Sequence, residues 1–111
     1  MIFSNHTFLT SASFATSGSE LTPPGVTNPL SKVVVEFYGT PSSKTVLFEG
    51  VGTVGAYLPI VATNLSTNTT ASQTTATADE IWSIPIAGLT KVRTRISAIS
   101  GSITAMGQVI I

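Results

Sequence analysis

The sequence contains no cysteine, a single histidine and very few charged residues. Without cysteine there can be no disulfide bond, no thiolate nucleophile and no thiolate metal ligand. Five basic and five acidic residues give a net charge of zero, so the chain has no electrostatic field with which to gather nucleic acid. Serine and threonine supply most of the polar groups instead, and so little like-charge repulsion favours association with other proteins.

Long hydrophobic runs are also missing. No stretch approaches the roughly 20 apolar residues that span a membrane. The first residues carry neither the basic segment nor the continuous apolar core of a signal peptide. We therefore expect no membrane partner, and a chain that is made in the cytoplasm and used without secretion.

Groups for acid, base or metal chemistry are scarce and scattered. Only Asp79 and Glu80 are adjacent carboxylates, and neighbouring residues of a strand point to opposite faces. We interpret this pair as a charged strand entrance that discourages edge pairing. His6 has no second ligand at metal-binding spacing. The sequence therefore predicts no catalytic residue, no metal site and no cofactor, which makes an enzyme the least favoured class of protein.

The chain is rich in β-branched residues, glycine and proline, and no apolar repeat keeps helical spacing for more than a turn. This composition predicts one all-β domain, an antiparallel β-sandwich of jelly-roll-like form. The strongest strand patterns cover residues 7–15, 33–38, 45–48, 56–61, 81–86, 92–99 and 103–110.

Two segments fall outside the regular strand pattern. Residues 17–29 contain three prolines and are expected to be a long connection. We therefore assign residues 1–30 to an N-terminal arm and first strand, and residues 31–111 to the sandwich body of the same domain. The polar stretch 63–78 is expected to be a loop that leads into a weak edge strand.

The segments 92–99 and 103–110 are predicted to form a β-hairpin that turns at Ser100-Gly101. In that register residues 92, 94, 96 and 98 pair with 109, 107, 105 and 103, which makes one largely apolar face. The other face would carry Arg93, Arg95, Met106 and Gln108. We expect the arginines on this outward face to meet a partner or an acidic residue of the same chain.

The order of the segments resembles a β-sandwich domain found in virion proteins of tailed bacteriophages. The resemblance covers roughly residues 30–111 and is carried by 33–39, 45–50, 56–60, 81–96 with its Arg93-Thr94-Arg95 motif, and the closing Ser100-Gly101-Ser102. It implies that Gly88 makes the turn into the hairpin strand and that both arginines lie outward. It supplies no catalytic residue.

The resemblance favours a non-enzymatic virion structural protein, most specifically a capsid decoration (cement) protein that stabilises the head by binding the major capsid protein. Such a chain would be made in the cytoplasm of the bacterial host and would lie on the head surface rather than the tail. It would be a homo-oligomer, with a trimer favoured. The partner interface is expected to draw on the arm and the hairpin: Ile2, Phe3, Phe8, Phe14, Arg93, Arg95, Met106 and Gln108.

The alternative function is a carbohydrate-binding module of a tail fibre or baseplate. In that case Tyr57 or Trp82 would stack on a sugar ring. Both aromatic residues lie in apolar strand patterns, so packing in the core is the competing interpretation. Burial of Trp82 would exclude it from sugar binding.

Overall fold

The computed structural model describes residues 3–24 and 28–111, apart from the side chain of Phe3. This part of the chain contains strands and no helix, which confirms the all-β class. The strands are β1 (Phe3–Ala12), β2 (Thr16–Ser17), β3 (Lys32–Gly39), β4 (Ser43–Val51), β5 (Leu58–Pro59), β6 (Ala62–Asn64), β7 (Thr69–Ala71), β8 (Gln73–Thr74), β9 (Glu80–Pro85), β10 (Lys91–Ser100) and β11 (Ile103–Ile110).

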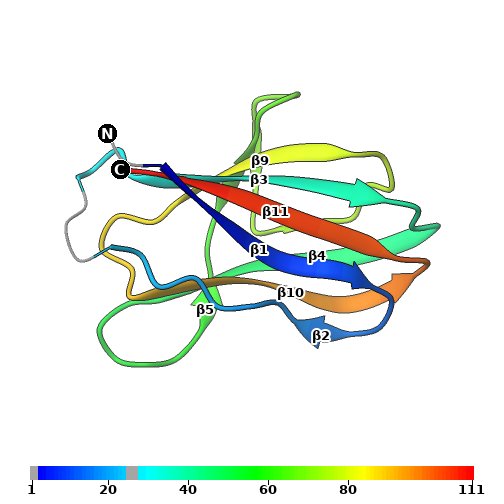
Figure 1. Ribbon diagram of the computed structural model, residues 1–111, viewed down its shortest axis with the longest axis horizontal. Coiled ribbons are helices and arrows are strands. Elements are labelled where there is room, and N and C mark those ends of the chain that lie inside the picture. Colours follow the sequence, from blue (N-terminus) through cyan, green and yellow to red (C-terminus); the bar gives the residue numbers. More distant parts are fainter. Residues whose placement is uncertain (1–2, 25–27) are drawn as a thin grey trace.

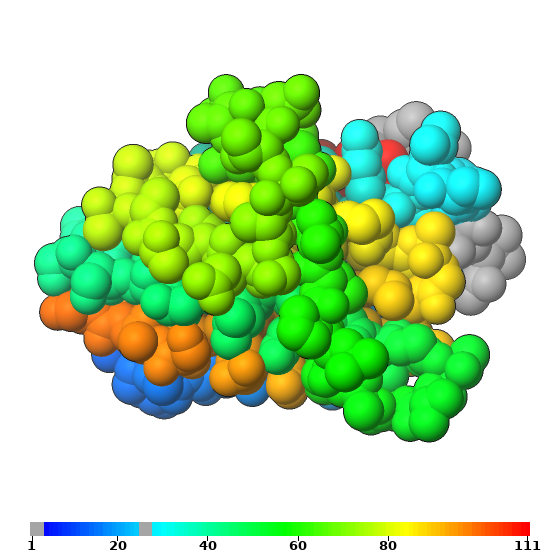
Figure 2. Space-filling model, turned by 180° about the vertical axis from the view of Figure 1, so that it is seen from behind, coloured from blue at the N-terminus to red at the C-terminus, as the bar shows by residue number. Residues whose placement is uncertain are grey.

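The strands form two antiparallel sheets, as the sandwich prediction required. The six-stranded sheet has the order β1-β11-β3-β9-β6-β7, and the five-stranded sheet consists of β2-β10-β4-β5 with β8 also paired to β4. Figure 1 shows the long strands of both sheets running along the same axis of the molecule. The β6–β7 turn and the loop between β4 and β5 project from the body in Figure 2.

The core lies between the two sheets and is built by alternation along each strand. Aromatic rings occupy its centre: Phe48 of β4 lies 4.9 Å from Trp82 of β9 and 6.0 Å from Phe37 of β3, measured between ring centroids. Side chains of both sheets surround this cluster, which buries the apolar surface that drives folding. They include Phe8, Val33, Val35, Val46, Ile84, Ile86, Val92, Ile96, Ile103, Ala105 and Val109.

The predicted hairpin is wrong, because β10 and β11 belong to different sheets. β10 pairs with β4 and β2, whereas β11 pairs with β1 and β3. The connection at Ser100-Gly101 is an arch that crosses from one sheet to the other (Figure 1). Its backbone bonds to the neighbouring connection: the Thr40 N–H donates to the Ser102 carbonyl and the Ser42 N–H to the Ser100 carbonyl.

The alternation on which the hairpin was based is nevertheless correct for most residues. Val92, Thr94 and Ile96 of β10 are buried, as are the four predicted partners on β11. They face one another across the core instead of lying side by side in one sheet. Ala98 is the exception, because a register shift between Ile96 and Ala98 leaves it exposed.

The arch also separates the predicted outward face into two surfaces. Arg93 and Arg95 lie on the outer face of the five-stranded sheet. Met106 and Gln108 lie on the outer face of the six-stranded sheet, on the opposite side of the sandwich. These four residues therefore cannot form one interface on a single copy of the chain.

The N-terminal segment is part of its own sandwich rather than an arm that reaches a neighbour. β1 pairs with β11 along its length and forms one edge of the six-stranded sheet. Phe8, an expected partner contact, is only 2% exposed and packs in the core, because a register shift after Thr7 lets both Phe8 and Leu9 turn inward. Phe14 follows β1 and is exposed.

The polar stretch after residue 62 is more ordered than expected. β6 and β7 form a hairpin at the edge of the six-stranded sheet, and Asn64 Oδ1 accepts hydrogen bonds from the Ser66 and Thr67 N–H groups in its turn. β8 then crosses to pair with β4. Short strands therefore occupy part of the expected loop, whereas its last residues, 75–78, where the alternation had indicated a weak edge strand, contain no strand.

Substituting Gly107 with alanine is expected to destabilise the fold by about 1–3 kcal/mol, because the interior has no room for a methyl group. A Cβ at this position would lie 2.8 Å from Phe8 Cε2 and 2.8 Å from Val33 Cγ2. Equilibrium unfolding in urea measures the loss. Gly52, where an added Cβ would meet nothing within 4 Å, provides the control. An equal loss for both variants would contradict the packing explanation.

Candidate functional site

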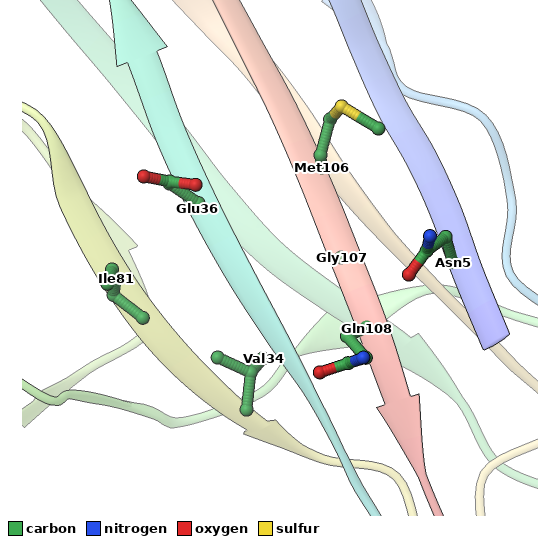
Figure 3. Close-up of a pocket in the computed structure, with 7 residues that line it drawn as sticks. All are labelled: Asn5, Val34, Glu36, Ile81, Met106, Gly107 and Gln108. Atoms are coloured by element: carbon green, nitrogen blue, oxygen red, sulfur yellow. The ribbon is translucent and has the colours of Figure 1, made fainter. Parts of the chain in front are cut away.

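The outer face of the six-stranded sheet is the broadest candidate for a binding surface. Strand register places its outward side chains in rows across the sheet. One row contains Thr7, Met106, Glu36 and Ile81, and the next contains Asn5, Gln108, Val34 and Ser83. Figure 3 shows Met106, Glu36 and Ile81 of the first row and Asn5, Gln108 and Val34 of the second.

This outer face mixes apolar and polar side chains and is only slightly hollowed. Met106 is 39% and Ile81 40% exposed, on the two strands that flank β3. Between them is a shallow depression of ≈ 350 Å³, lined by residues of four strands. An open surface with exposed apolar side chains among polar groups is suited to a protein partner, since sites for small molecules are usually deeper.

The outer face of the five-stranded sheet carries a charge cluster instead. Glu49 of β4 lies opposite Arg93 of β10. Arg93 Nε donates to Glu49 Oε1 at 2.9 Å, while Arg95 donates to both carboxylate oxygens, from Nε at 3.0 Å and from Nη2 at 3.1 Å. The expected outward arginines therefore meet an acidic residue of the same chain, which was one of the two predicted outcomes.

Tyr57 extends this cluster to the long connection before β3. The Arg93 guanidinium lies over the Tyr57 ring, 3.7 Å from its centroid, and the Tyr57 hydroxyl donates to a carboxylate oxygen of Glu20. Burial and the hydrogen bond to Glu20 raise the pKa of Tyr57 to about 12. The same hydrogen bond lowers the pKa of Glu20, so both groups keep their ordinary neutral-pH charge states.

Protonation of Glu49 is expected to weaken the fold in acid. Burial raises the pKa of Glu49, but hydrogen bonds from Arg95 and Arg93 outweigh it, and the net pKa lies below the ordinary value of 4.5. A lowered carboxyl pKa contributes stability above the unfolded-state pKa, and this stability is lost as the pH falls through the folded-state pKa. Urea midpoints should therefore fall less steeply below about pH 5 in Glu49→Gln than in the unchanged chain. Parallel curves would contradict this role.

A second polar cluster is buried inside the sandwich. Lys44 Nζ of β4 donates to Glu80 Oε1 of β9 at 3.0 Å, and the two side chains are 0% and 7% exposed. Glu80 also accepts from Thr74 Oγ1 at 2.7 Å and from Trp82 Nε1 at 3.2 Å. The interpretation of Glu80 as part of a charged strand entrance was therefore wrong. β9 is an interior strand, between β3 and β6, and its alternation turns Glu80 inward.

Of the two expected sugar-stacking residues, Trp82 is buried and Tyr57 is half-buried. Trp82 is 4% exposed and lies against Phe48 in the core. Tyr57 has one face of its ring under Arg93. Burial of Trp82 contradicts its assignment to a glycan site, because stacking requires an accessible ring.

The residues expected to form one partner interface lie on different parts of the domain. Met106 and Gln108 remain on an exposed face and Phe14 is exposed on a loop, whereas Phe8 is buried and the arginines bond to Glu49. Ile2 and the side chain of Phe3 lie outside the described residues. Sequence reasoning did not identify three residues of the same outward face, namely Val34, Glu36 and Ile81. The alternation along 33–38 and 81–86 could have predicted that these three side chains point outward.

The described residues contain neither a cluster of metal ligands nor a membrane-spanning helix. No three histidine, cysteine or carboxylate side chains gather closely enough to hold a metal ion within 3–24 and 28–111. His6, the only histidine, donates from Nε2 to the Ser19 carbonyl at 3.0 Å. In the same ranges no helix has the length and apolar character needed to cross a bilayer.

Comparison with known proteins identifies relatives of the whole domain. The sequence model of the XepA family matches residues 3–109. The crystal structure of the SPBc2 prophage-derived protein YomS superposes with a TM-score of 0.87 at 24% identity, covering 99% of this chain and 94% of that one. At that level of identity the likeness shows the fold.

The crystal structure of the PBSX exported protein XepA gives a TM-score of 0.86 at 28% identity. The match covers 97% of this chain but only 37% of XepA, so this chain spans little more than a third of that protein. No curated protein matches the sequence. These relatives support a phage-derived protein with an all-β fold, which agrees with the phage resemblance at that level.

Proposed function

This chain belongs to the XepA family, and we propose from that premise that it is a non-enzymatic phage accessory protein that works by binding other proteins. In its most specific form the proposal is a capsid decoration protein, a homo-oligomer that binds the major capsid protein on the head of the virion. XepA is an exported phage protein, which is compatible with a location in released particles.

The outer face of the six-stranded sheet is the observation that supports this proposal. It is open and mixes exposed apolar side chains with polar ones, as the surface of a non-obligate protein interface commonly does. Two of the five carboxylates are held in ion pairs: Glu49 is bonded to two arginines and Glu80 to a buried lysine. With Trp82 in the core, the carbohydrate-binding alternative has lost its main stacking residue.

Quantitative mass spectrometry of purified phage particles, produced by a host that carries the gene, tests the proposal. We expect the chain in a fixed ratio to the major capsid protein, and immunogold electron microscopy should place it on the head. Its absence from particles would overturn the virion assignment. Label confined to the tail would overturn the decoration role alone.

A matched pair of variants tests whether the outer face of the six-stranded sheet makes the contact. Met106→Asp removes an exposed apolar side chain and adds a second negative charge beside Glu36, whereas Ser97→Asp places one on an exposed position of β10 in the other sheet. Only the first is expected to lower the copy number per particle. Equal copy numbers would exclude this face as the binding surface.

A further inference from the structure

Three side chains that can react with one another meet inside the sandwich around one carboxylate. Lys44 Nζ lies 3.0 Å from Glu80 Oε1, and Asn64 Nδ2 lies 3.5 Å from Glu80 Oε2. Lys44 belongs to β4 of the five-stranded sheet, whereas Asn64 and Glu80 belong to β6 and β9 of the six-stranded sheet. An amine, a carboxylate and a primary amide are therefore held together across the core, and the particle contact proposed above does not use them.

Strand register explains why Asn64 points to this place. Asn64 is paired with Trp82 of β9, and directly paired residues lie on the same face of a sheet. Trp82 is buried in the core, so Asn64 faces inward beside it. Glu80 lies two residues before Trp82 and shares that inward face. Lys44 reaches the same point from the facing sheet, with its side chain fully buried.

The β6–β7 turn orients and polarises the amide of Asn64. Its Oδ1 accepts hydrogen bonds from the Ser66 N–H at 2.9 Å and from the Thr67 N–H at 3.4 Å, which directs Nδ2 toward Glu80. Donors on a carbonyl oxygen stabilise the negative charge that develops there when a nucleophile attacks the carbonyl carbon. The Cγ atom of Asn64 is therefore an electrophile whose oxygen already has two backbone donors.

Burial makes Lys44 a suitable nucleophile. Its Nζ lies 5.1 Å from the Phe37 ring centroid, on an apolar side of the site. Keeping two charges in a core is costly, and transfer of one proton from Nζ to Glu80 removes both charges and leaves an amine with a free electron pair. Hydrogen bonds from Thr74 Oγ1 and Trp82 Nε1 hold the Glu80 carboxylate in position for this transfer.

We propose that the folded chain joins Lys44 to Asn64 by an isopeptide bond. Glu80 takes a proton from Nζ, and the neutral amine attacks Cγ of Asn64, so that a Nζ–Cγ bond forms. Glu80 then gives its proton to Nδ2 and receives a second proton from Nζ, and the Cγ–Nδ2 bond breaks. Ammonia leaves and Glu80 ends protonated. No electrons are gained or lost, so the reaction needs neither oxidant nor reductant.

The two reacting atoms are brought together by the fold and by the length of the lysine side chain. Both nitrogens contact the same carboxylate, and the flexible four-carbon stem of Lys44 lets Nζ move from Glu80 to the neighbouring Cγ. Such positioning within one molecule greatly accelerates bond formation. The contact between Nδ2 and Glu80 is long, and contacts of this kind commonly shorten as a reaction proceeds.

The bond ties the two sheets together and leaves no charge in this part of the core. It joins β4 to β6, and as a cross-link it restricts the unfolded chain in the way a disulfide does. The chain has no cysteine with which to form a disulfide. Unreacted chains keep the ion pair of Lys44 and Glu80. The reaction occurs once per chain and is independent of binding to a particle.

Intact-mass spectrometry of the purified full chain tests the bond. The unchanged chain is expected to be lighter than its sequence mass by one molecule of ammonia, whereas Asn64→Ala should have its full sequence mass. Asn5→Ala, the same exchange at an exposed asparagine of β1, is the control and should still lose ammonia. Chymotrypsin cleaves after Phe48 and Tyr57, and the fragments that contain Lys44 and Asn64 should remain joined after this digestion.

Glu80→Gln tests the proton transfer, because it keeps the shape of the side chain and removes the base. We expect the linked fraction to fall by about tenfold or more in this variant. If Glu80→Gln does not fold, the mass and the fragments of the unchanged chain still decide. Full sequence mass in the unchanged chain, or fragments that separate, would overturn the bond. Loss of ammonia that hydroxylamine reverses would indicate a succinimide at an asparagine and would overturn it as well.

Discussion

Replacing Lys44 with methionine is expected to lower the free energy of unfolding by about 3–5 kcal/mol, because it leaves Glu80 as a buried charge without its counter-ion. A domain of this size typically has a total stability of about 5–15 kcal/mol. This single exchange would therefore remove a large part of it. The side chain of Lys44 is fully buried, and methionine fills a similar volume, so a cavity adds little to the effect.

The loss expected for Lys44→Met lies near the lower end of the range of about 3–5 kcal/mol, because Glu80 keeps its other hydrogen-bond donors. Thr74 Oγ1 lies 2.7 Å from Oε1 and 2.9 Å from Oε2 of the carboxylate, and Trp82 Nε1 lies 3.2 Å from Oε2. Hydrogen bonds to the charged form stabilise it. The ammonium group of Lys44 also lies 5.1 Å from the Phe37 ring centroid, a favourable contact that the variant loses.

Equilibrium unfolding in urea, followed by Trp82 fluorescence, measures the loss. The control is Lys44→Met/Glu80→Met, in which both charges are gone. Replacing a whole buried ion pair by apolar residues is often neutral or stabilising, so the double variant should recover most of the loss of the single variant. If the double variant instead lost as much as the two single variants added together, the pair would not act as a coupled unit.

The sequence predicts most of the long strands and their inward faces because both depend on local alternation, whereas of the expected strand 56–61 only Leu58–Pro59 is a strand. The expected segment 103–110 coincides with β11, and 33–38 and 92–99 lie within β3 and β10. Alternation says nothing about which strand lies beside which. Ser100-Gly101 is compatible with a hairpin and with an arch, and the pairing of β10 and β11 in different sheets identifies the arch. The pairing of β10 with β11 was therefore predicted wrongly, although the burial pattern of both strands was predicted correctly for most residues.

The buried ion pair between Lys44 and Glu80 could have been predicted in part from the alternation of their strands. Lys44 shares its strand face with Val46 and Phe48, and Glu80 shares its face with Trp82 and Ile84. A charge on an inward face predicts a buried partner of opposite sign, since an unpaired buried charge is very costly. Joining these two residues still requires a contact between β4 and β9 of different sheets, which no local pattern supplies.

Predicting the rows of side chains on the outer face of the six-stranded sheet requires the register between strands as well as alternation along each strand. The outward direction of Glu36 and Ile81 follows from their own strands. Their positions opposite each other, and that of Met106 beside Glu36, depend on the register of β9, β3 and β11, which are far apart in sequence. Register between such strands is set by packing of the whole core. The candidate site could therefore be predicted residue by residue, but not as a surface.

Truncating Trp82 to alanine is expected to cost about 3–5 kcal/mol, the usual loss for a large aromatic side chain in a core. Trp82 packs on Phe48 at 4.9 Å and donates from Nε1 to Glu80, so its removal opens a cavity and weakens the buried ion pair together. Trp82→Phe keeps an aromatic ring against Phe48 but lacks the indole N–H that donates to Glu80. We expect this variant to lose about 1–3 kcal/mol of stability.

Thermal unfolding followed by far-ultraviolet circular dichroism suits these variants, because they lack the only tryptophan. Tyr38→Ala is the control: Tyr38 is 37% exposed at the end of β3, and its loss should change stability much less. The two explanations of Trp82 predict opposite outcomes. A sugar-stacking residue could be removed with the fold intact, whereas a core residue that also holds a buried carboxylate could not. An unchanged melting curve for Trp82→Ala would thus return Trp82 to the list of candidate binding residues and contradict its place at the centre of the sandwich.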